Sequence, residues 1–90
     1  MNSSAITENA VSEFEGFLVK EERGKATIEK YIREVRLFRQ WLCNRTLAKE
    51  AVIEWKEYLQ KEGYAPVTVN AKLSALNGFF SFMGWTEFRV

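Results

Sequence analysis

The chain has no histidine, one cysteine (Cys43) and one proline (Pro66) among its 90 residues. Without histidine, neither a Ser/His/Asp nor a Cys/His catalytic arrangement can form. A lone cysteine cannot make an intrachain disulfide, and a structural zinc site needs several cysteine or histidine ligands. We therefore expect no metal, no cofactor and no catalytic residue in this sequence.

Long apolar runs and phosphate-binding loops are also missing. No run approaches the ~18 apolar residues that a membrane span requires, and no GxxxxGK[ST] loop occurs. Residues 1–4 lack the basic region and apolar core of a signal peptide. We expect a cytoplasmic location without a membrane partner, and structural roles for the tyrosines Tyr31, Tyr58 and Tyr64.

Positive charge is concentrated in one part of the chain, although the net charge is only +1. Residues 25–45 hold six basic and two acidic residues, whereas residues 1–24 hold two basic and five acidic residues. Residues 63–86 contain no carboxylate at all. A surface that meets phosphates excludes acids, but a mostly buried helix also carries few charges. The sequence leaves both explanations open.

Apolar residues recur with helical spacing and predict a single all-α domain of four helices. The first follows Thr7, a predicted N-cap, and ends near Gly24; the others cover about residues 26–43, 48–62 and 66–83. Gly63 is expected to end the third helix, which Trp55 anchors in the core.

The second predicted helix carries a group of arginines. At 100° per residue, Arg33 and Arg36 lie away from its apolar stripe, while Arg39 projects close to that stripe. Such a group is often only a solvated face that pairs with neighbouring acids, here Glu29 and Glu34. Contact with the phosphates of duplex DNA is the other interpretation.

In two segments of the chain, the joint order and spacing of certain residues are more specific than any single position. These residues are Thr27-Ile28, Tyr31, Glu34-Val35, Phe38 and Trp41-Leu42 in the first segment, and Gly63, Ala65, Thr68-Val69-Asn70, Lys72-Leu73-Ser74-Ala75-Leu76 and Phe79-Phe80 in the second. Over about residues 8–85, this order resembles the N-terminal core-binding domain, also called SAM-like, of phage integrases and other tyrosine recombinases. The resemblance implies a small orthogonal four-helix bundle.

The resemblance also implies that the domain grips duplex DNA as one half of a clamp. The expected DNA contacts are Thr27, Lys30, Arg33 and Arg36 on the second helix, and Thr68, Asn70, Lys72 and Ser74 on the fourth. Three positions depart from the family pattern. Lys25 replaces a common capping serine, and Ala71 and Asn77 stand where arginines are frequent.

The same resemblance predicts the domain organisation. Residues 1–6 would be a flexible N-terminus, residues 7–84 the core-binding domain, and residues 85–90 the start of a linker toward a catalytic domain that this chain lacks. The chain by itself would not be an enzyme. It would be the fragment of a bacterial or phage-encoded, nucleoid-associated recombinase that acts in DNA integration or recombination. Its partners would be double-stranded DNA, its own catalytic domain and other protomers of a synaptic complex.

Two alternatives remain open from the sequence. One is a helical protein-interaction module whose partner surface would include Trp41, Trp85 and Phe88. The other is a free-standing DNA-binding regulator.

Overall fold

The computed structural model describes residues 5–90, and its helices occur where the apolar periodicity predicts them. In chain order they are α1 (Glu8–Lys20), α2 (Lys25–Leu42), α3 (Lys49–Lys61), α4 (Pro66–Met83) and the short 3₁₀ turn η1 (Thr86–Phe88). The part of the chain that the structure describes contains no β-strand. The expected all-α, four-helix domain is confirmed.

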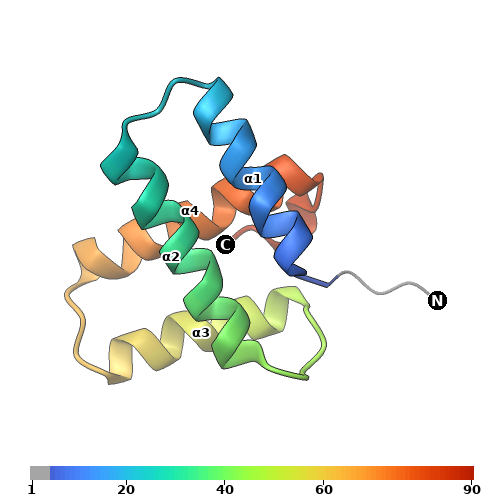
Figure 1. Cartoon of the computed structure of the whole chain (residues 1–90). Coiled ribbons are helices and arrows are strands. Elements are labelled where there is room, and N and C mark those ends of the chain that lie inside the picture. Colours follow the sequence, from blue (N-terminus) through green and yellow to red (C-terminus); the bar gives the residue numbers. More distant parts are fainter. Residues whose placement is uncertain (1–4) are drawn as a thin grey trace.

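Helix α2 lies in the middle of the molecule (Figure 1). It packs along α1 and crosses α4, and these two helix pairs make the most extensive contacts between elements. Helix α3 packs against α4, and its Trp55 ring lies 5.8 Å from the Phe38 ring of α2. The basic helix α2 is therefore held between the acid-rich α1 on one side and the carboxylate-free α4 on the other.

Local signals in the sequence set most of the helix ends. The Thr7 hydroxyl oxygen accepts a hydrogen bond from the Ala10 amide at 3.0 Å and caps α1 as predicted. Pro66 occupies the first position of α4, where its missing N–H leaves no bond unmade. Gly63 (φ 91°) and Gly84 (φ 77°) take the left-handed conformation after α3 and α4.

The prediction that Gly24 ends α1 is wrong. Glu22 takes the left-handed conformation instead (φ 59°), and Gly24 is the extended N-cap residue of α2. The Glu22 and Arg23 amides donate to the carbonyls of Val19 and Leu18 at 2.9 and 3.2 Å. These bonds satisfy carbonyls in the last turn of α1, so the helix ends at Lys20, four residues before the glycine.

One apolar core joins all four helices and η1. Four phenylalanine side chains, Phe14, Phe38, Phe79 and Phe80, are almost completely buried at its centre. Trp55 is buried as well, which confirms its predicted position in the core. Aromatic side chains thus supply much of the apolar surface that this small domain buries.

The packed domain extends beyond residues 7–84 at both ends. Residues 1–4 of the expected flexible N-terminus lie outside the described residues, but Ile6 is buried in the core. At the other end, η1 stands where the start of a linker was expected, and Phe88 packs edge-on against Phe80 with ring centroids 5.8 Å apart. The apolar side chain of Phe88 therefore completes the core beyond residue 84.

The side chain of Asn77 in α4 makes two hydrogen bonds with the backbone of Val90. Its side-chain amide donates to the Val90 carbonyl at 2.9 Å, and its side-chain oxygen accepts from the Val90 amide at 3.0 Å. The family that the sequence resembles often has an arginine at this position, whereas Asn77 makes a local structural contact.

Candidate nucleic-acid interface

The eight residues expected to contact DNA lie on two helices that cross each other, α2 and α4. Six of them are exposed: Thr27, Lys30, Arg33, Arg36, Asn70 and Ser74. The other two, Thr68 and Lys72, are only partly exposed. The structure shows that the basic members of this group have quite different surroundings.

Lys72 is held in a buried ion pair at the crossing of α2 and α4. Its ammonium group lies 3.1 Å from both carboxylate oxygens of Glu34 and 4.9 Å from the centre of the Tyr64 ring. Only 13% of the Lys72 side chain and 3% of the Glu34 side chain are exposed. Lys72 therefore connects two helices, a role that the sequence did not reveal.

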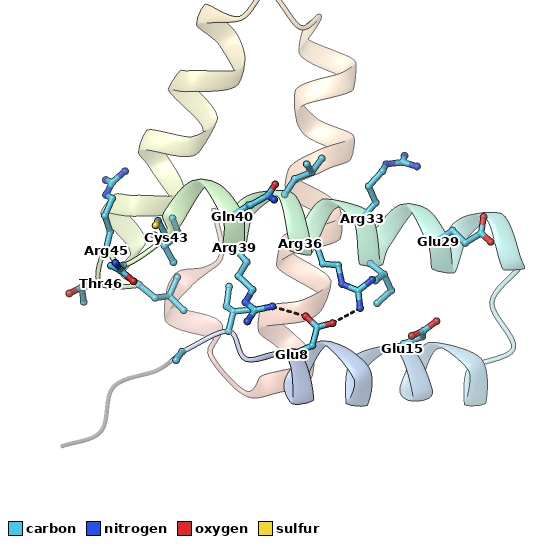
Figure 2. Close-up of a pocket in the computed structure, with 17 residues that line it drawn as sticks. Glu8, Glu15, Glu29, Arg33, Arg36, Arg39, Gln40, Cys43, Arg45 and Thr46 are labelled. Atoms are coloured by element: carbon cyan, nitrogen blue, oxygen red, sulfur yellow. Dashed lines mark hydrogen bonds and ion pairs between the residues drawn. The ribbon is translucent and has the colours of Figure 1, made fainter.

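Arg36 is bound to an acid from α1. Its guanidinium group donates to one oxygen of Glu8 at 2.5 Å, and the Arg39 guanidinium donates to the other at 2.6 Å (Figure 2). The hydrogen bond from Arg36, with a further contribution from Arg39, holds the pKa of Glu8 below its ordinary value. Arg39 lies close to the apolar stripe of α2, and from this position its side chain reaches over the edge of the core to Glu8 of α1.

Arg33 is the most open of the arginines in the predicted group. Its side chain is 62% exposed, and the nearest carboxylate oxygen, on Glu34, is 4.0 Å away. Figure 2 shows Arg33 pointing away from α1, whereas Arg36 points toward Glu8. The two arginines share the outer side of α2, but only Arg33 is directed away from the acidic helix.

An open groove of about 1050 Å³ runs along this side of α2. Its basic lining comprises Arg33, Arg36, Arg39 and Arg45, and its acidic lining comprises Glu8, Glu15 and Glu29. Arg45 is also occupied, because it pairs with Glu54 and lies over the Trp41 ring at 4.5 Å. The groove is thus a surface of mixed charge in which most guanidinium groups already have a partner.

The solvent-facing side of α4 is uncharged and mostly polar, apart from the exposed Val67 in its first turn. Asn70, Ser74 and Ser81 are exposed there, and the one charged residue of the helix is Lys72, on the side that meets α2. Burial explains why the opposite, apolar side of α4 carries no carboxylate. It does not explain why this exposed side carries none. Neutral amides and hydroxyls can approach a phosphate backbone without repulsion and can donate hydrogen bonds to it.

Of the aromatic residues proposed for a protein-interaction surface, one lies in the core, and Trp41 and Trp85 are partly buried against it. Phe88 is buried, Trp85 packs edge-on against Phe79 with ring centroids 6.0 Å apart, and Trp41 packs against Phe38 and Trp55. Their apolar surface is therefore largely used for folding.

Comparison with known protein families gives a match to the model described as phage integrase, N-terminal SAM-like domain, over residues 11–87. No curated protein and no solved structure matches the chain. Between residues 5 and 90, no helix has both the length and the apolar character needed to cross a membrane. The family match covers most of the sequence and agrees with the four-helix architecture. The chain belongs to the phage integrase N-terminal SAM-like domain family.

Proposed function

We propose that this chain is the core-binding domain of a tyrosine recombinase and grips duplex DNA during integration or recombination. The observation that carries the proposal is family membership over residues 11–87. The concentration of basic residues on α2 and the uncharged polar side of α4 support it. Strand cleavage and joining would be performed by a catalytic domain that lies outside this sequence.

In this proposal the two helices make different kinds of contact. Arg33, Lys30 and Thr27 on α2 bind backbone phosphates through charge and hydrogen bonds. On α4, Ser74 and Thr68 donate to phosphates, and the Asn70 amide reaches a base edge.

Lys72 has an indirect role among the eight proposed residues. Because its ammonium group is paired with Glu34, it acts mainly by fixing α4 against α2.

The remaining partners follow from the proposed role in recombination. Residues 85–90 would lead toward the catalytic domain of the same protein, and further protomers would join on DNA in a synaptic complex. The setting would be the cytoplasm of a bacterial cell, on chromosomal or phage DNA.

Binding to a short duplex of random sequence, followed by fluorescence anisotropy at low salt, tests the proposal. We expect micromolar or weaker affinity, because one half of the clamp is absent. Arg33→Ala should weaken binding about fivefold for every duplex sequence alike, as loss of an exposed phosphate contact does. Lys61→Ala removes an exposed charge from the last turn of α3 and should change little.

Two results would contradict this function or this surface. Absence of duplex binding by the folded wild-type domain at low salt would refute the DNA-binding role. Equal affinities of Arg33→Ala and Lys61→Ala would show that DNA meets another face.

A further inference from the structure

The contact among Glu8, Arg36 and Arg39 has the geometry of an occupied anion site. Two guanidinium groups, one helical turn apart on α2, each bind a different oxygen of one carboxylate, at 2.5 and 2.6 Å. We propose that Arg36 and Arg39 form a phosphate site for the DNA backbone, and that Glu8 occupies this site in the free domain and competes with DNA. This inference rests on the proposed DNA-binding function and adds Arg39 and Glu8 to the residues that govern it.

The three side chains are accessible to a ligand. Exposed fractions are 55% for Glu8, 50% for Arg36 and 41% for Arg39, and all three line the open groove along α2. Exposed ion pairs contribute little to stability. An incoming phosphate can therefore replace the carboxylate without disturbing the core, which is impossible for the buried pair of Glu34 and Lys72.

The chemistry of the site suits a phosphate diester. Planar guanidinium groups bind phosphate oxygens and carboxylate oxygens with the same fork of N–H donors. Duplex DNA adds a gain that Glu8 does not have, because each neutralised phosphate releases condensed counterions. Glu8, once displaced, remains in the first turn of α1, where the helix dipole favours an acidic side chain.

Glu8 acts as a competitor across the neutral pH range. The hydrogen bond from Arg36 lowers the pKa of Glu8, so its carboxylate stays ionised at neutral pH and below its ordinary pKa. Release of the arginines consequently depends on displacement by another anion rather than on protonation in mildly acidic solution.

The chain offers a matched control for the charge of Glu8. Glu15 lies two turns further along α1 and lines the same groove, but it makes no ion pair with any residue between 5 and 90. Glu8→Gln and Glu15→Gln therefore remove the same charge from the same helix, and only the first removes a competitor from the arginines.

Duplex-binding isotherms of these variants at 0.15 M salt test the competition. Glu8→Gln should tighten binding about three- to fivefold, which is the range of an exposed ion pair, while Glu15→Gln should tighten it less than about twofold through screened charge alone. The double variant Arg36→Ala/Arg39→Ala should lose more affinity in the Glu8→Gln background than in the wild type, because Glu8 no longer occupies the two guanidinium groups. Thermal unfolding checks that each variant is folded.

The outcomes separate the competition from the DNA-binding function itself. If Arg33→Ala weakens binding but Glu8→Gln and Glu15→Gln behave alike, the competition is wrong and DNA binding stands. A second outcome is that Glu8→Gln tightens binding but Arg36→Ala/Arg39→Ala loses the same affinity in the wild-type and Glu8→Gln backgrounds. Glu8 then acts through charge alone, and the phosphate site is refuted. If neither the wild type nor Glu8→Gln binds duplex DNA, both proposals fail.

Discussion

Among residues 5–90, Glu34 is the buried charged side chain, and its partner Lys72 lies 38 positions away in the sequence. Helical spacing shows which residues are neighbours on one helix, so Glu34 was expected to pair with arginines of α2. It does not show which helices cross, or where. Lys72 was therefore predictable as a basic residue of α4, but its pairing with Glu34 was not. The contact of Arg36 with Glu8 was unpredictable for the same reason.

Replacement of Lys72 should show how strongly the stability of the domain depends on the buried ion pair. Lys72→Met keeps the apolar stem but leaves the Glu34 carboxylate buried beside an apolar side chain. We expect a loss of about 2–4 kcal/mol in the free energy of unfolding, measured by urea denaturation. The double variant Glu34→Leu/Lys72→Met should recover most of this loss, since an apolar pair needs no charge compensation. A single variant as stable as the wild type would show that water reaches Glu34 freely.

At the scale of helices, the sequence predicts type and extent well because the signals are local. The ends of α3 and α4 follow from Gly63, Pro66 and Gly84, each of which fixes the backbone where it stands. The end of α1 was misplaced because Glu22, not a glycine, takes the left-handed conformation there. Phe88 was missed because one buried aromatic side chain in a short turn leaves no periodic pattern.

Gly78 in α4 provides a prediction about a single helix. A Cβ atom at this position would lie 3.5 Å from Cε2 of Tyr31 and 3.9 Å from Cζ of Phe14, which are ordinary contact distances. Gly78→Ala should therefore stabilise the domain by about 0.5–1 kcal/mol, because alanine has the higher helix propensity. Gly16→Ala in α1, where a Cβ atom would meet nothing within 4 Å, is the matched control.

Thermal unfolding of both alanine variants checks this expectation. A clear destabilisation by Gly78→Ala alone would mean that α2 and α4 need a closer approach than the structure shows. A stabilised Gly78→Ala variant with weaker DNA binding would indicate that the glycine serves the approach of DNA instead.

At the scale of the whole molecule, the fold places the acid-rich α1 next to the basic α2. The sequence shows the separation of charge along the chain but not this juxtaposition. As a result, the predicted basic surface is partly neutralised in the free domain: Glu8 holds two arginines, and Arg33 remains open. In the proposed mode of DNA binding, simple phosphate contacts would combine with the exchange of one anion for another.

The salt dependence of DNA binding should report this difference. With three or four phosphate contacts, the logarithm of the binding constant should fall with the logarithm of salt concentration at a slope of about −3, or −0.9 per contact. Arg33→Ala should make the slope shallower by nearly one unit, because an open guanidinium group is lost. Arg36→Ala should change it by less, since Arg36 gives up a carboxylate when it gains a phosphate, and the freed Glu8 attracts cations again. Equal changes for the two variants, measured by anisotropy titrations across a salt series, would mean that Glu8 does not hold Arg36 in solution.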